Sequence, residues 1–169
     1  GKSWAVWVWR EGGWGLAEMR IKNRAARLVA WHGRTGRGSP LTHAAPLSFT
    51  FDLGDVPILA DPGPSLDNPE LAEAATAVSA HSVLLLDGRA PAAGTEAVFD
   101  LGRVDGKKAR FDGHHDGFLK LGIPLSHKRK LLLNQARLTV TDTLTPTRAK
   151  PGRHAVQIAW QFGPGWAIE

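Results

Sequence analysis

The 169-residue chain contains no cysteine and no tyrosine. The absence of cysteine excludes disulfides and thiolate metal sites, and it leaves both reducing and oxidising compartments open. No run of apolar residues approaches the length of a membrane span. Gly1-Lys2-Ser3 brings neither an initiator methionine nor the apolar segment of a signal peptide, so we expect a processed product or an excised domain.

A chain of 169 residues, of which 43% are hydrophobic, is long and apolar enough to form one domain with its own core. The net charge of +5 and the pI near 10 favour a polyanionic partner, either an acidic polysaccharide or a nucleic acid. The sequence contains no recognised nucleic-acid-binding motif, which argues against the nucleic acid. Charge alone does not choose between the two.

Alternating apolar residues predict β-strands along most of the chain. In the segment 47–53, Leu47, Phe49 and Phe51 alternate with polar residues, which is typical of a strand with one buried face. Similar patterns occupy residues 4–10, 15–21, 27–32, 82–86, 97–103, 125–133, 137–143 and 152–162. Glycine-containing turns separate these segments, so we predict an all-β, antiparallel β-sandwich.

One segment departs from the β pattern. Asn68 can cap a helix, Pro69 fits the first helical position, and Glu70 and Glu73 complement the positive end of the helix dipole. We therefore predict one short helix over residues 68–78. No internal repeat or linker is visible, so residues 1–169 are expected to form a single domain.

Several short motifs follow one another in a definite order. A histidine, His43, precedes Leu47-Ser48-Phe49; Asp61-Pro62-Gly63 comes next; and Ala80-His81-Ser82-Val83 leads to Asp87-Gly88. In this order they resemble the C-terminal β-sandwich domain of heparinase II/III-like polysaccharide lyases. The later segments Gly113 to Phe118, His127 to Leu131 and Leu138 to Asp142 fit the same pattern, and the resemblance runs from about Trp14 to Trp166.

The resemblance implies that the chain is a fragment of a larger bacterial lyase. In such enzymes a groove for an acidic polysaccharide lies between an α/α-toroid catalytic domain and the sandwich, and the toroid is not in this chain. The expected partners are therefore the glycan and the toroid domain of the parent protein. By the same resemblance, the parent is expected in the periplasm or outside the cell.

The resemblance also places His43, Asp61 and His81 on positions that hold a structural zinc ion, and imidazole with carboxylate suits zinc. The chain departs from the family pattern at three positions: Leu41 and Ala45 replace a histidine and an aspartate, and Ser82 replaces a common asparagine. The alternative is that both histidines are hydrogen-bonded sandwich residues and that Asp61 organises its own proline-glycine turn. The sequence leaves both interpretations open.

Elimination from a uronic acid needs a base for the C5 proton, a group that neutralises the carboxylate, and a proton for the leaving oxygen. Relatives place a catalytic tyrosine on the sandwich, and this chain has none. We therefore assign no catalytic residue and expect the isolated domain to be inactive. The alternative function is a non-catalytic carbohydrate-binding module.

The basic residues are candidates for binding sulfate or carboxylate groups, since arginine makes bidentate contacts with them. We assign substrate binding to Arg34, Arg37, His115 and Arg129. The alternative is a set of solvated strand faces and loops. In Lys128-Arg129-Lys130 successive side chains alternate, so only one or two can share a face.

Two further groups of residues have competing interpretations. His114, His115 and Asp116 are expected on a glycine-flanked turn, either as an acid-base cluster or as a solvated turn. Trp7 and Trp9 are expected on one face of a strand and Trp4 on the other. They form either a platform for sugar rings or, as we prefer here, part of the core and of an interface with the missing domain.

Overall fold

The structure is a computed structural model that describes residues 4–9, 13–31, 45–63, 74–75, 77, 80–92, 94–105 and 108–166. The strands in these residues are β1 (Trp4–Trp9), β2 (Trp14–Ile21), β3 (Arg24–Trp31), β4 (Phe49–Leu53), β5 (Val56–Leu59), β6 (Leu84–Leu86), β7 (Val98–Asp105), β8 (Lys108–His115), β9 (Leu125–Asn134), β10 (Leu138–Pro146) and β11 (Val156–Ile158). A 3-10 turn, η2 (Leu119–Leu121), precedes β9.

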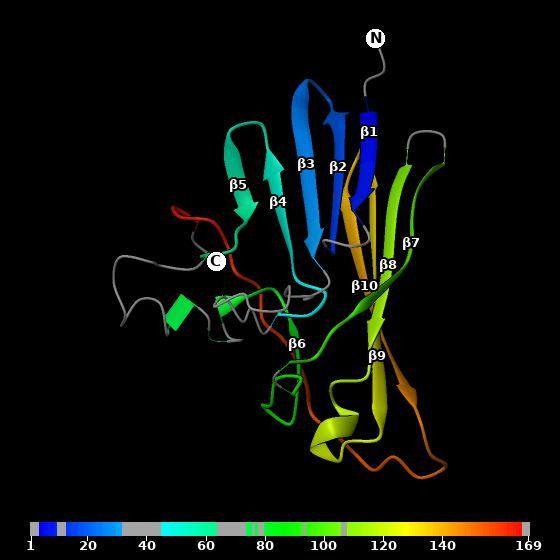
Figure 1. The fold of residues 1–169 in the computed structure, drawn as a ribbon. Coiled ribbons are helices and arrows are strands. Elements are labelled where there is room, and N and C mark those ends of the chain that lie inside the picture. Colours follow the sequence, from blue (N-terminus) through cyan, green and yellow to red (C-terminus); the bar gives the residue numbers. More distant parts are fainter. Residues whose placement is uncertain are drawn as a thin grey trace.

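The strands form two large antiparallel sheets and one small one (Figure 1). The five-stranded sheet has the order β1-β2-β3-β4-β5, and the four-stranded sheet has the order β10-β9-β8-β7. Strands β6 and β11 pair separately. Side chains of the two large sheets share one core, which confirms the predicted all-β sandwich.

The core follows from the alternation of buried residues along each strand. From the five-stranded sheet it takes Ala17, Leu28 and Phe51, and from the four-stranded sheet it takes Phe111 and Leu133. A glycine in β2 sets the spacing between the layers. A Cβ on Gly15 would lie 2.5 Å from the ring of Phe111, so only glycine admits this ring.

Two strands were absent from the sequence prediction. Strand β5 is short and contains Pro57, which weakens the strand pattern. Strand β8 carries charged residues on its outer face, and its inner face includes Gly113 and His115. The predicted turn at His114 and His115 is therefore wrong: both belong to the end of β8, and the turn begins after them.

The predicted strand over residues 152–162 is shorter in the structure. Only Val156–Ile158 forms a strand, β11. The segment beyond it runs beside β5 through an isolated bridge between Leu59 and Phe162 and a hydrogen bond from the amide of Gly163 to the carbonyl of Ile58. These contacts dock the C-terminal segment on the edge of the five-stranded sheet.

Most of the predicted helix over residues 68–78 lies outside the described residues. Of that range the structure describes Ala74, Ala75 and Ala77, and the first two are helical. Within the described part of the chain, no helix has the length and apolar character needed to cross a bilayer.

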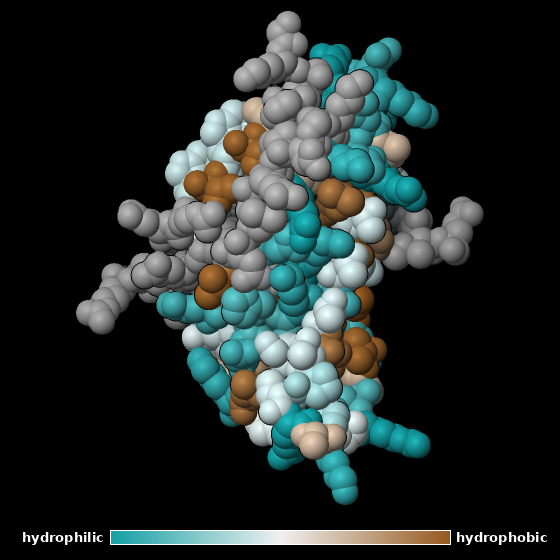
Figure 2. All heavy atoms as spheres, turned by 90° about the vertical axis from the view of Figure 1, so that its right-hand side faces the viewer, coloured by the Kyte–Doolittle hydropathy of each residue, from teal (hydrophilic) through white to brown (hydrophobic). Residues whose placement is uncertain are grey.

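Two tryptophans of β1, Trp7 and Trp9, lie outside the core. Trp7 and Trp9 share the outer face of the five-stranded sheet, with 41% and 51% of their surfaces exposed. The core-packing interpretation is therefore wrong for these two residues. Figure 2 views the molecule from the side on which β7 and β8 lie in Figure 1, and there apolar residues form separate patches between polar ones.

Candidate functional site

Asp61 and His81, two of the three residues predicted to hold zinc, lie side by side. Asp61 follows β5 and His81 precedes β6. Nδ1 of His81 lies 2.9 Å from Oδ2 of Asp61, and the His81 side chain is completely buried. The amide of Gly63 donates to Oδ1 of Asp61 at 2.9 Å, so the predicted role of Asp61 in its own proline-glycine turn is confirmed.

This pair has the chemistry of an oriented histidine ligand. A carboxylate that holds Nδ1 of a histidine fixes its ring and directs Nε2 toward a metal, as is common for zinc-bound histidines. His43, the third predicted residue, lies outside the described residues. Within the described part of the chain, no group of three histidine, aspartate or glutamate side chains could hold a metal ion. The zinc site therefore stays a prediction.

Beside this pair, Arg129 of β9 connects four segments of the chain. Its Nη1 atom donates to the carbonyl of Ser82, which follows His81, at 2.5 Å and to the carbonyl of Leu47 at 3.1 Å. Its Nε and Nη2 atoms bind the carboxylate of Asp142 in β10 at 2.7 and 3.0 Å. Bidentate contacts of this kind combine strength with fixed geometry.

Arg129 does not present its charge to solvent. Only 1% of the residue is exposed, and its guanidinium carbon lies 5.6 Å from the ring centre of Phe49 and 5.9 Å from that of Trp160. We predicted this arginine as a glycan ligand, and the structure places it among protein acceptors inside the sandwich. Lys128 and Lys130 point to the opposite face, which confirms the predicted alternation.

Two histidines extend the network from Asp142. The amide of Gly117 donates to Nδ1 of His115 at 3.2 Å, so His115 carries its proton on Nε2. Nε2 of His115 therefore donates to Nδ1 of His127 at 3.1 Å, and Nε2 of His127 in turn donates to Oδ1 of Asp142 at 2.8 Å. Each ring therefore has one donor and one acceptor, which is the pattern of neutral imidazole.

The pKa values agree with this proton order. Burial lowers the pKa of His115 to about 3, and the neighbouring imidazole of His127 and guanidinium of Arg129 act in the same direction. Burial also lowers the pKa of His127, against the opposing effect of its hydrogen bond to Asp142. Burial raises the pKa of Asp142, but hydrogen bonds from His127 and Arg129 outweigh it and bring the value to about 2.

His115, predicted to bind substrate, lies beneath a small surface hollow. The hollow has a volume of about 140 Å³, and its lining includes Glu96, His114, Asp116 and Lys120. His115 is 2% exposed, whereas His114 is only partly buried. The more accessible histidine at this hollow is therefore His114. The predicted ligands Arg34 and Arg37 lie outside the described residues.

The sequence analysis did not identify Asp142 as the partner of Arg129. This residue and Arg129 are directly opposite in the register of β9 and β10, and both are buried. The sequence did contain one signal for this ion pair. The strand of Arg129 has one arginine on its inward face, and the strand of Asp142 has one aspartate on its inward face. The pairing of the strands could not be read from either strand alone.

The sequence matches the family described as "Heparinase II/III-like, C-terminal" over residues 2–169. The chain belongs to this family. Among curated proteins, none matches the sequence.

Solved structures resemble this heparinase II/III-like domain in fold. A heparinase III gene product has a TM-score of 0.67 and 14% identity over 83% of this chain. The heparan sulfate lyase HepC from Pedobacter heparinus has a TM-score of 0.65, also with 14% identity over 83% of this chain. A HepC mutant gives 0.63 and 16% over 80%. The chain spans 22%, 22% and 21% of their lengths, so it corresponds to about a fifth of each protein.

Proposed function

We propose that this heparinase II/III-like domain is the sandwich part of a polysaccharide lyase and forms one wall of a groove for an acidic glycan. The observation that carries the proposal is the family match over residues 2–169, since the described sandwich lies wholly within it. The matched part of the chain covers only 22% of the heparinase III gene product, so the other wall would be the α/α-toroid domain of the parent protein. The net charge of +5 favours an acidic ligand.

In this proposal the chain shapes the groove and does not carry out the elimination. The chain has no tyrosine to act as a proton donor or acceptor. Two of its histidines, His115 and His127, are already joined by a hydrogen bond in the interior. A base for the C5 proton and a group that neutralises the uronate carboxylate would therefore come from the rest of the parent protein.

We also propose that a structural zinc ion links the segment of His43 to that of His81. Imidazole nitrogens of the two histidines would coordinate the ion, and Asp61 would orient His81. Support comes from the neighbouring backbone: Nη1 of Arg129 binds both Leu47 and Ser82. Ala45 and Val83 also belong to one buried cluster. Residues close to the two histidines in sequence thus share one buried cluster.

Metal content measured by mass spectrometry on dialysed protein tests the zinc proposal. The chain should retain close to one zinc ion per molecule, and the double variant His43→Ala, His81→Ala should retain none. His154→Ala, at a histidine in another part of the fold, is the matched control and should retain the metal. Equal zinc content in the double variant, or no metal in any protein, would overturn the zinc proposal and leave the groove proposal unaffected.

Incubation of the chain with heparan sulfate tests the groove proposal. Affinity electrophoresis should show binding that weakens as salt increases. Ultraviolet absorbance should show no unsaturated product, because the catalytic groups are absent. Failure to bind at low salt would contradict the proposal that the chain forms a wall of the groove. Product formation would contradict the proposal that the catalytic groups lie in the rest of the parent protein.

A further inference from the structure

The outer face of the five-stranded sheet carries exposed tryptophans and a polar hollow, and the lyase proposal assigns no role to either. We propose that this face binds a neutral, hydroxyl-rich sugar chain, at a surface separate from the Asp61–His81 pair. The proposal does not depend on the groove or on zinc. It rests on three exposed indole rings and on the polar hollow beside them.

The indole rings are arranged by strand register. Trp9, Trp14 and Trp31 lie opposite one another on β1, β2 and β3. The ring centres of Trp14 and Trp31 are 5.9 Å apart, and the buried Trp31 supports the exposed Trp14. Trp7 follows in the adjacent row. The exposed fraction is 41% for Trp7, 51% for Trp9 and 46% for Trp14.

This arrangement suits the face of a pyranose ring. An indole is large and rigid, and its negative face attracts the C–H groups on one side of a sugar ring. It loses little conformational entropy on binding, because only two side-chain torsions become fixed. The core shared by the two large sheets lies on the other face, so it does not account for the exposed rings of Trp7, Trp9 and Trp14.

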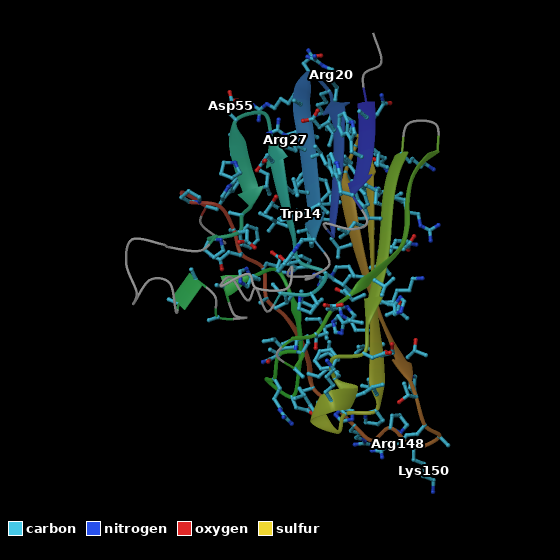
Figure 3. The ribbon with its side chains drawn as sticks, viewed as in Figure 1. Trp14, Arg20, Arg27, Asp55, Arg148 and Lys150 are labelled. Atoms are coloured by element: carbon cyan, nitrogen blue, oxygen red, sulfur yellow. The ribbon has the colours of Figure 1, made fainter. Side chains whose placement is uncertain are left out.

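A polar hollow continues the same face beyond Trp7. Its volume is about 640 Å³, and its lining includes Glu18, Arg20, Arg27, Asp52 and Asp55. Nε of Arg27 bonds to Oε1 of Glu18 at 2.9 Å, so these two lining side chains form an ion pair. Figure 3 shows Trp14, Arg27 and Arg20 following one another along the sheet, with Asp55 at the β4–β5 turn.

The charges of the hollow indicate which sugars fit. Three carboxylates face two guanidinium groups, so these charged side chains sum to −1, although the whole chain has a charge of +5. A polyanion would meet the three carboxylates and be repelled. Sugar hydroxyls can donate to carboxylates and accept from arginines, as in many ligand sites with a few fixed polar groups. The hollow therefore favours an uncharged sugar chain.

Affinity electrophoresis in gels that contain hydroxyethyl cellulose or glucomannan tests the proposal directly. The chain should be retarded in at least one of these neutral gels. Trp9→Ala and Trp14→Ala should each weaken the interaction roughly tenfold. Trp166→Ala removes an equally exposed indole from the far edge, beyond β5, and should leave retardation unchanged. Circular dichroism checks that every variant is folded.

A heparin gel tests the charge argument. Replacing three carboxylates by amides, in the variant Glu18→Gln, Asp52→Asn, Asp55→Asn, should strengthen retardation by heparin several-fold. No retardation in either neutral gel would overturn the proposal. The proposal would also be overturned if only heparin retarded the chain and Trp9→Ala weakened that retardation. This result would show that the face binds acidic glycans. Neither result affects binding of heparan sulfate at the proposed groove.

Discussion

Nε2 of His127 lies 2.8 Å from Oδ1 of Asp142 in the interior of the sandwich. His115 lies on the other side of the His127 ring, and Arg129 binds both oxygens of Asp142. The carboxylate is thus ionised between two partners, whereas both histidines are neutral. The interior holds one ion pair and two uncharged rings, an arrangement that acid will disturb.

We expect the domain to lose stability as the pH falls below about 6.5. An unfolded histidine takes up a proton near that pH, whereas folded His115 does so only at about 3. The free energy of unfolding should therefore decrease by at most about 1.4 kcal/mol per pH unit for each such histidine. Below about 4, protonation of Asp142 in the unfolded chain adds to the loss. Urea unfolding at pH 7, 6 and 5 measures the slope.

The variant His115→Gln is the control for this prediction. It removes one of the two titrating rings, so its stability should depend less steeply on pH between 6 and 5. Equal free energies of unfolding at pH 7 and pH 5 in the original chain would show that the buried histidines are not held neutral.

The second prediction concerns Arg129. Arg129→Met should destabilise the domain by about 3–5 kcal/mol, because Asp142 would then be a buried charge without its cation. Arg129→Lys should also destabilise it, since an ammonium group cannot reproduce the planar fork. In the double variant Arg129→Met, Asp142→Asn, the amide oxygen still accepts from His127, and part of the stability should return. Urea unfolding at pH 7 compares them, and a fully stable Arg129→Lys variant would refute the bidentate role.

The third prediction tests the contact between Gly15 and Phe111. Gly15→Ala should destabilise the domain by about 1–3 kcal/mol, because the new methyl group overlaps the phenyl ring. Combining it with Phe111→Leu should cost less than the sum of the single changes, since leucine vacates part of that space. Thermal unfolding of the four proteins gives the coupling. Additive effects would mean that the two residues do not compete for space.

The fourth prediction concerns His154, whose environment is opposite to that of His127. Nδ1 lies 2.7 Å from Oδ2 of Asp87 and Nε2 lies 2.8 Å from the carbonyl of Pro151, so both ring nitrogens must donate. The hydrogen bond to Asp87 raises the pKa of His154, and the same bond lowers the pKa of Asp87. Stabilisation by this pair is present below pH 6.5 and is lost as the pH rises through the folded pKa of His154.

Nuclear magnetic resonance titration of the His154 ring checks this prediction. Its midpoint should lie above 6.5 in the original chain and should move down toward 6.5 in Asp87→Asn. An unchanged midpoint in that variant would rule out the ion pair. His154→Gln also supplies a background in which the acid response of His115 and His127 can be measured alone.

The sequence predicted the strands whose two faces differ clearly in polarity. The alternation around Phe49 and Phe51 identified β4, because one face is buried and the other is not. It failed for β8, where Asp112 lies on the outer face and is nevertheless buried. It also failed for β5, because Pro57 interrupts the pattern. The polarity of a residue and its neighbours in sequence does not show whether a segment far away in the sequence covers that residue in the fold.

The candidate site was predicted from motif order and not from physical chemistry alone. That order identified Asp61 and His81, and the structure brings them into contact. It did not identify the use of Arg129, because a lone basic residue in a strand is ordinarily solvated. The partner Asp142 becomes evident only when β9 and β10 are placed in register.

The contacts of Arg129 also have a consequence for the order of folding. Its hydrogen bonds span 82 positions to Leu47 and 47 positions to Ser82, so they close long loops. Hairpins such as β9–β10 need no such closure and can form early. We therefore expect the arginine network to assemble after the rate-limiting step, so that Arg129→Lys accelerates unfolding and leaves the refolding rate nearly unchanged. Arg129 would then slow the unfolding of the domain without contributing to the rate at which it folds.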